Sequence, residues 1–383
     1  MFRKQKLGQK YVNSQTFLLK FNSWVFITSQ LFGYFPLSIL RDPSFETQSL
    51  ESTPTFHSLP FILCWTNILG IIAWLGGFTV IMLEPHDEIT HESETDEFGY
   101  ILWSIVGTTA ILSVRIFRLT NRNKFLTFWA CVIHLNRKLK ATFPEIWATV
   151  LLPSMMDISN FFFNQIFPYL VAVTGIVVMN LVRIFFFPDQ VYYAPVHTEL
   201  IISIWDFFIF FHIIHTFVPL YFVKLLTAYF SALHRLLGIK GVQNNSLSLP
   251  QDKIFVETIH LDPKELTMIL SFLAMLEELV TQFNVLYSVD ILSIVGLSGM
   301  QVLAGFYILF TRKLLYYVVV NYMGFILLYS IVIWNFCIFG AALTNSALEC
   351  LKQIENVSSD NFSDAEQFKV WILSLFCCQL WKY

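Results

Sequence analysis

Charged residues are scarce in this sequence. Only 13% of its 383 residues are charged, compared with about 25% in soluble domains, whereas 56% are hydrophobic and 40 are phenylalanine. So few charges cannot cover a soluble surface, and the uncharged runs approach the ~20 residues that a bilayer core requires. The composition therefore predicts an all-α fold, a polytopic bundle of transmembrane helices.

Motifs for catalysis and metal binding are also missing from the sequence. There is no glycine-rich phosphate loop, no Ser-His-Asp arrangement and no zinc-ligand spacing, so we expect neither an enzyme nor a metal site. His212 and His215 share a helical face, but no second histidine cluster accompanies them, which disfavours a diiron enzyme. We expect no cofactor and no nucleic-acid partner.

Cysteines and signal-peptide features are sparse as well. The six cysteines fall in predicted spans or in predicted cytosolic segments, so we expect no disulfide. The N-terminus is basic, but the apolar run after it contains Asn22 and Gln30 and has no small-residue cleavage site. The pattern therefore predicts no secretory signal peptide.

The positions of the basic residues orient the chain. Residues 115–140 hold seven of the 24 basic residues and no acid, whereas residues 84–97 hold seven acids and no Lys or Arg. Residues 98–112 between them are apolar. Because Lys and Arg near span ends stay in the cytosol, we predict that residues 115–140 are cytosolic and that the acidic loop faces out.

Six apolar runs predict membrane spans, and the N-terminus is then cytosolic. They are residues 61–83, 98–112, 167–187, 200–223, 285–310 and 316–340. Residues 147–187 form either one long helix with a single crossing or two spans. Residues 17–40, interrupted by polar residues, either span the membrane or, as we favour, form an amphipathic helix on its inner surface. Residues 41–60 are expected to be a flexible connector.

The chain is predicted to have three parts. They are an N-terminal cytosolic segment (residues 1–60), a bundle (61–340) with cytosolic helical extensions (115–147 and 224–284), and a cytosolic amphipathic segment (341–383). Within the second extension, Asp262, Pro263 and Glu265 form a helix-start pattern, since the Asp262 carboxylate accepts from first-turn amides and proline suits the first helical position.

Several motifs resemble the insect gustatory receptor family, which is related to the insect odorant receptors. They are LFGYFP at residues 31–36, RNKFL at 122–126, HLNRKL at 134–139, NVLYSVDIL at 284–292 and FCCQLWKY at 376–383. The resemblance implies a ligand-gated, non-selective cation channel in the plasma membrane. It also implies a homo- or hetero-tetramer with related subunits, in contact with lipid and a small tastant such as a sugar or bitter compound.

The family's pore lies in a seventh span that carries Thr-Tyr and Gln-Phe. This sequence reaches Tyr383 before any such motif, so we expect a truncated or divergent member and can assign no pore residue. The alternative hypothesis is a multipass transporter or a non-conducting receptor-like protein.

The resemblance also implies a ligand pocket in the outer half of the bundle. The aromatic and polar residues expected there are Tyr100, Trp103, Asn180, Arg183, Trp205, Asp206, Tyr317, Asn321 and Tyr322. Aromatic faces with a few polar tips suit sugars or aromatic compounds, although such residues also form interfacial belts. An acid inside a span is costly, so Asp206 is expected to pair with Arg183 or to contact ligand. Asp290 lies closer to the cytosolic edge of its span, so solvation or a helix-packing bond is sufficient to explain it.

Overall fold

The computed structural model describes the chain in segments. These are residues 29–34, 36, 38–41, 48–51, 59–83, 94–158, 160–161, 164, 171, 175, 178, 204, 208, 212, 215–245, 263–311 and 316–355. Apart from one short hairpin, the regular structure in these segments is helical. The predicted all-α class is confirmed.

The hairpin lies where the sequence predicted an amphipathic helix followed by a flexible connector. Strand β1 (Ser38–Arg41) pairs antiparallel with β2 (Gln48–Glu51), and Ser38 lies opposite Glu51. The helical prediction is therefore wrong for the last residues before position 41. Gly33, with φ of 70°, and Pro36 are unsuited to continuing a helix, and the ladder then satisfies the backbone groups of both strands.

Two long helices and a shorter one follow the hairpin. Helix α2 spans Leu59–Leu83, α3 spans Glu94–Thr120 and α4 spans Arg122–Thr142. A single turn residue, Asn121, separates α3 from α4. Its side-chain amide donates to the Phe117 carbonyl at 3.1 Å and covers one of the last carbonyls of α3.

The next helical stretch begins at a proline. Helix α5 (Pro144–Ile146) continues directly into a π-helical turn, η1 (Trp147–Leu151), and the helix extends to Ile158. Proline suits this first position because its missing N–H would have no intrahelical partner there.

Three further long helices complete the described structure. Helix α8 spans Phe217–Asn245, α9 spans Pro263–Thr311 and α10 spans Tyr316–Glu355. Helix α9 begins at the predicted proline and ends at Thr311, one residue past the predicted end of its span. Helix α10 continues beyond residue 340, where its predicted span ended.

Four stretches among the described residues are long and apolar enough to cross a membrane. They are Leu59–Val80, Phe217–Gly238, Thr267–Tyr307 and Ile326–Ile354. The second extends well past residue 223, the predicted end of a span. The ammonium of Lys224 lies 4.3 Å from the centroid of the Phe339 ring, so this one charge does not end the apolar helix. The spans predicted at residues 98–112 and 167–187 remain predictions.

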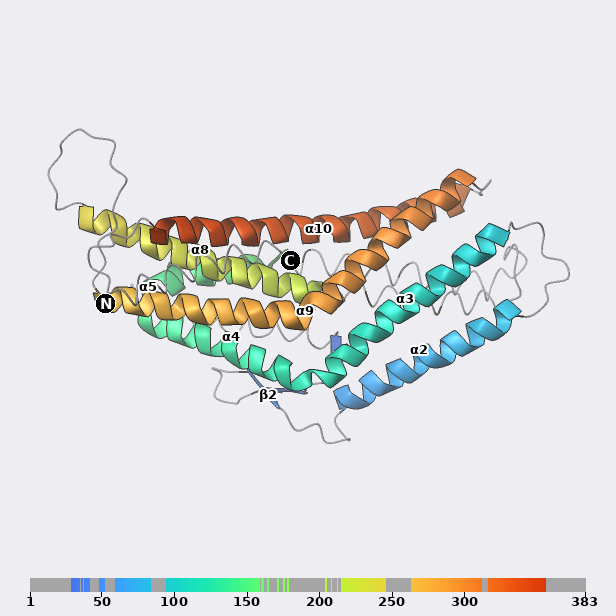
Figure 1. The fold of residues 1–383 in the computed structure, drawn as a ribbon, viewed down its shortest axis with the longest axis horizontal. Coiled ribbons are helices and arrows are strands. Elements are labelled where there is room, and N and C mark those ends of the chain that lie inside the picture. The colour runs from blue at the N-terminus through green and yellow to red at the C-terminus, as the bar shows by residue number, and fades with distance from the viewer. Residues whose placement is uncertain are drawn as a thin grey trace. The chain divides into compact units, whose positions relative to one another are not determined.

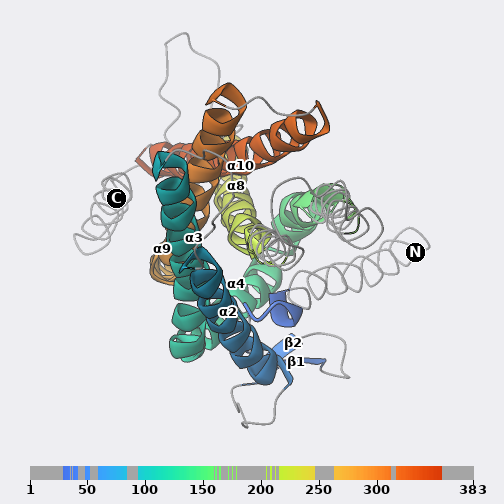
Figure 2. The same cartoon turned by 90° about the vertical axis from the view of Figure 1, so that its right-hand side faces the viewer.

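The chain divides into two compact units. Unit 1 comprises Met1–Leu126, Ser159–Pro219 and Leu286–Asn335, and unit 2 comprises Thr127–Ile158, Leu220–Val285 and Phe336–Tyr383. In unit 1, α2 and α3 run side by side, and the hairpin lies near the start of α2 (Figures 1 and 2). Buried side chains of α2 that face this unit's core include Cys64, Ile68 and Ile71.

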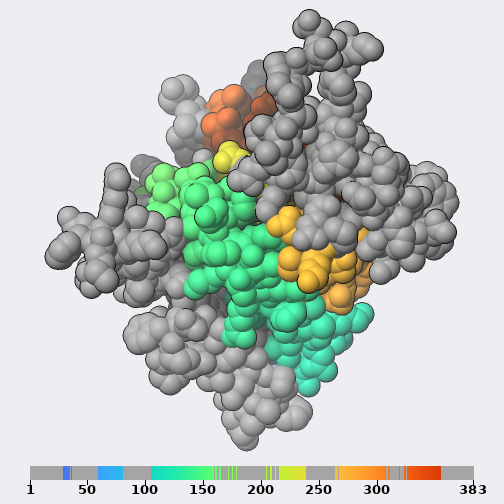
Figure 3. Space-filling view, turned by 90° about the vertical axis from the view of Figure 1, so that its left-hand side faces the viewer, coloured from blue at the N-terminus to red at the C-terminus, as the bar shows by residue number. Residues whose placement is uncertain are grey.

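Unit 2 has an aromatic core. The Phe128 ring packs edge-on against Phe222, with 4.9 Å between ring centroids, and the Phe143 ring lies 5.7 Å from Phe272. Helix α4 and the start of α9 lie next to each other on the face seen in Figure 3, in green and orange. The Lys138 ammonium donates to the Ser271 hydroxyl across this contact at 3.1 Å.

A glycine in unit 1 permits close packing of α9 against α10. A Cβ built on Gly305 would lie 2.7 Å from Cγ1 of Ile326, whereas a Cβ on Gly299 of the same helix would meet nothing within 4 Å. We expect Gly305→Ala to lower the free energy of unfolding by about 1 kcal/mol through overpacking. Gly299→Ala is the matched control, and SDS titration in mixed micelles measures both. Equal effects of the two substitutions would contradict this packing argument.

Candidate functional site

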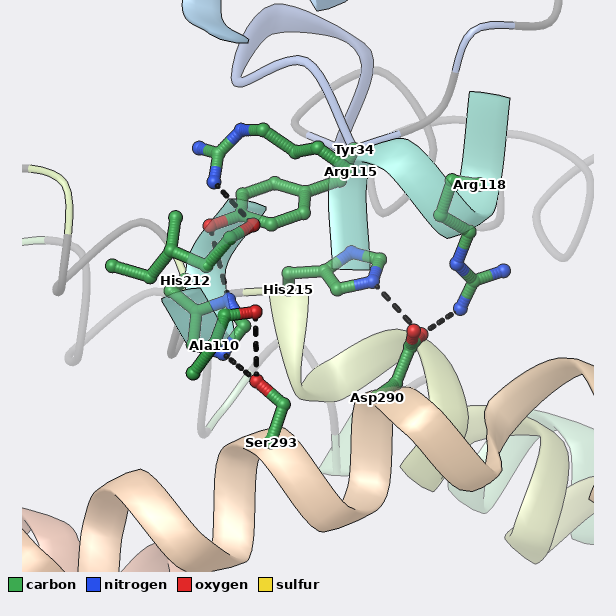
Figure 4. Close-up of polar contacts among 9 residues, drawn as sticks. Tyr34, Ala110, Arg115, Arg118, His212, His215, Asp290 and Ser293 are labelled. Carbon is green, nitrogen blue, oxygen red and sulfur yellow. Dashed lines mark hydrogen bonds and ion pairs between the residues drawn. The ribbon is translucent and has the colours of Figure 1, made fainter. Parts of the chain in front are cut away.

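Unit 1 contains a cluster of buried polar side chains from four parts of the chain (Figure 4). Its members are Tyr34 before β1, Arg115 and Arg118 on α3, His212 and His215 before α8, and Asp290 and Ser293 on α9. Apart from Ser293, every one of these side chains is at most 1% exposed. Each helical segment contributes two residues spaced by three, which places both on one helical face.

A charged triad forms one half of the cluster. Nη2 of Arg118 donates to Oδ2 of Asp290, and Nε2 of His215 lies 3.2 Å from the same oxygen. The guanidinium carbon of Arg118 is 3.9 Å from the Phe125 ring centroid and 4.2 Å from that of Tyr287. The carboxylate is thus held by two donors, and the arginine is enclosed by aromatic faces that favour a cation.

A chain of hydrogen bonds forms the other half. The Ser293 hydroxyl donates to the Ala110 carbonyl at 3.1 Å, so its oxygen is left to accept from Nε2 of His212, also at 3.1 Å. That assignment places the proton of His212 on Nε2 and leaves Nδ1 as an acceptor. The Tyr34 hydroxyl, 3.1 Å from Nδ1, is therefore the donor. Burial raises the pKa of the Tyr34 phenol, which keeps this proton in place.

Arg115 joins α3 to the segment before β1. Its Nη1 donates to the Ile111 carbonyl at 3.3 Å and its Nη2 to the Phe32 carbonyl at 3.2 Å. Its guanidinium carbon lies 3.9 Å from the centroid of the Tyr34 ring. Among the described residues no carboxylate forms an ion pair with Arg115, so carbonyl dipoles and an aromatic face stabilise this buried cation.

The arrangement is suited to holding segments together. His212 makes hydrogen bonds through both ring nitrogens and His215 through Nε2, and the described residues contain no group of three or more His, Cys, Asp or Glu able to hold a metal ion. The cluster links α3, α9, the helical residues before α8 and the segment before β1 through charged and polar contacts.

The nine predicted ligand-binding residues are distributed differently. Tyr100 and Trp103 lie in α3, and Tyr317, Asn321 and Tyr322 lie in the first turns of α10. For these five residues the structure describes the helical backbone but not the side chains. The others lie outside the described residues altogether: Asn180, Arg183, Trp205 and Asp206. The Arg183–Asp206 pair and the pocket therefore remain predictions.

The structure decides between the two explanations for Asp290. Its side chain is 0% exposed, so solvation does not account for it. The alternative, a helix-packing bond, is confirmed, because the carboxylate on α9 pairs with Arg118 on α3. In the sequence, Arg118 belongs to the basic stretch predicted to be cytosolic, residues 115–140. A signal was present nonetheless, since three apolar segments each carry two polar residues spaced by three. Only the fold shows that these faces meet.

Loss of the Tyr34 hydroxyl tests the hydrogen-bond chain. We expect Tyr34→Phe to lower the free energy of unfolding by about 1–2 kcal/mol, because Nδ1 of His212 would remain buried without a donor. Tyr229→Phe in unit 2 is the matched control: that side chain is 2% exposed, and its hydroxyl has no hydrogen-bond partner among the described residues. SDS titration in mixed micelles measures both variants. A larger loss of unfolding free energy for Tyr229→Phe than for Tyr34→Phe would contradict the assignment of the Tyr34 hydroxyl as the donor to Nδ1 of His212.

Comparison with known proteins gives one family. The family model described as 7tm chemosensory receptor matches residues 24–366 of the chain. A search of curated proteins gives no significant match. The matched region includes every member of the buried polar cluster.

Proposed function

Because the chain belongs to the 7tm chemosensory receptor family, we propose that it is a gustatory receptor subunit that forms a ligand-gated, non-selective cation channel in the plasma membrane. The observation that carries the proposal is the family match over residues 24–366. The bundle of long apolar helices supports a membrane-embedded receptor. The motifs that resemble gustatory receptors favour tastants such as sugars or bitter compounds as ligands, and a homo- or hetero-tetramer with related subunits as the assembly.

The proposed mechanism is a shift between two conformations. A tastant binds among the nine predicted pocket residues and binds the open arrangement more tightly than the closed one, which moves the population toward the open state. The buried cluster has a supporting role in this mechanism. Its ion pair and hydrogen bonds hold α3 and α9 together within unit 1, so movements of one are transmitted to the other.

Current recordings with a tastant panel test this proposal. Cells expressing the chain, alone and with related subunits, should give cation currents in response to at least one sugar or bitter compound. Trp103→Ala in the predicted pocket should raise the half-maximal concentration at least about tenfold, equivalent to about 1.4 kcal/mol of lost binding. Trp334→Ala is the matched control, because Trp334 in α10 is 66% exposed on an apolar span.

The outcomes separate the components of the proposal. Saturable tastant binding to purified protein without current would contradict channel function but retain a receptor. Equal effects of the two tryptophan substitutions would contradict the pocket. No binding and no current across the panel, with protein present at the cell surface, would overturn the gustatory assignment.

A further inference from the structure

The Tyr34 side chain occupies a site with two faces built for an aromatic ring. On one face the guanidinium carbon of Arg115 lies 3.9 Å from the ring centroid, which is cation–π geometry. On the other, the imidazole of His215 is stacked at 4.4 Å between centroids, with an interplanar angle of 8°. The Tyr34 side chain is fully buried between them (Figure 4).

The same site recognises a hydroxyl at the far end of the ring. Nδ1 of His212 accepts from the Tyr34 hydroxyl, and the serine contact on the other imidazole nitrogen fixes Nδ1 as the acceptor. An unsubstituted aromatic ring would fill the slot but leave this buried acceptor unpaired. The slot therefore has the chemistry of a site for a phenol.

The short segment that carries Tyr34 is held in a turn by its own backbone hydrogen bonds. The amide of Tyr34 donates to the Ser29 carbonyl at 2.8 Å, and the amide of Gly33 donates to the Gln30 carbonyl at 3.1 Å. A further polar contact of this segment with the cluster is made by the Phe32 carbonyl, which accepts from Arg115. These contacts show a compact turn that projects one aromatic alcohol into the slot.

We propose that residues 29–34 form a strap whose Tyr34 side chain is an intramolecular ligand of a phenol-binding site built by Arg115, His212 and His215. Attachment of the strap is then a binding equilibrium. The covalent link gives Tyr34 a high effective concentration, and a free phenol binds the same slot once the side chain is removed. This inference does not depend on channel activity, because its tests measure binding and stability.

Chemical rescue of Tyr34→Ala tests the site. The alanine variant removes the ring and the hydroxyl but keeps Cβ, which leaves space shaped for phenol, as engineered apolar cavities bind benzene. The full chain in detergent is heated with increasing phenol, and unfolding is followed with a thiol-reactive dye that reports exposure of the buried cysteines Cys64 and Cys350. We expect phenol to raise the melting temperature of this variant saturably, with half-saturation near about 1 mM.

Two comparisons identify the slot as the source of the effect. Benzene, which lacks the hydroxyl, should require at least tenfold higher concentration for the same shift. Wild-type protein, whose slot is filled by Tyr34, should show no saturable shift over the same range. Tyr229→Ala in unit 2 also removes a buried tyrosine and should show no preference for phenol over benzene.

Any of three results would overturn the proposal. The first is that phenol does not raise the melting temperature of Tyr34→Ala saturably. The second is that phenol raises the melting temperature of wild-type protein equally, and the third is that benzene is as effective as phenol. If Tyr34→Ala aggregates on extraction, the extraction is repeated with phenol or benzene present. Recovery of monodisperse protein with phenol alone supports the site, and failure with both contradicts it.

Discussion

Replacing Asp290 with alanine is expected to lower the free energy of unfolding by about 3–5 kcal/mol, the largest effect predicted for this chain. The carboxylate is 0% exposed and accepts from Arg118 and His215. Its removal leaves the buried guanidinium uncompensated, and uncompensated buried charges carry costs of this size. SDS titration of the full chain in mixed micelles measures the loss.

Two further variants separate charge from general disruption of α9. Glu278→Ala removes an exposed carboxylate from the same helix, and we expect it to change stability by less than about 0.5 kcal/mol. The double variant Arg118→Met with Asp290→Leu removes both charges and should recover most of the stability lost by Asp290→Ala alone. A double variant as unstable as the sum of its single substitutions would show that the ion pair is not the cause.

Gly33→Ala is expected to lower the free energy of unfolding by about 2–4 kcal/mol. Gly33 has φ of 70°, where a residue with a Cβ is strained by about 1–2 kcal/mol. The added Cβ would also lie 2.9 Å from Cβ of Asn67, a position close to the backbone of α2 that cannot rotate away. The Asn67 amide donates to the Leu63 carbonyl at 2.8 Å, which holds this side chain in place. The same SDS titration measures the effect.

Gly76→Ala in α2 is the control for this substitution. A Cβ there would meet nothing within 4 Å, and the position is helical. Alanine is the better helix former, so we expect unchanged stability or a gain of up to about 1 kcal/mol. A loss of stability at Gly33 and none at Gly76 is the expected result. Similar losses in the free energy of unfolding at both positions would mean that the backbone φ of Gly33 and its contact with Asn67 do not explain the effect of Gly33→Ala.

The two substitutions act on opposite ends of one arrangement. Asp290 anchors the charged triad, and Gly33 shapes the turn that delivers Tyr34 to the hydrogen-bond chain.

Composition and charge distribution alone determined the class of this protein. A chain with so few charges must satisfy its backbone groups internally, so long helices follow, and the separation of acidic and basic segments orients them. The start of α9 at Pro263 and the break at Asn121 were also predictable, because capping and turn chemistry are local. The hairpin was not, since a ladder depends on a partner strand.

Only the tertiary structure identified the buried cluster. In the sequence, Arg115 and Arg118 belong to a basic stretch, and Asp290 lies 172 residues from the arginine that it pairs with. Polar residues spaced by three show that a face exists, but they do not show which face it meets. Side-chain pairing between distant helices depends on packing. Because Asp290 is buried in the fold, its loss leaves the charge of Arg118 buried without a partner.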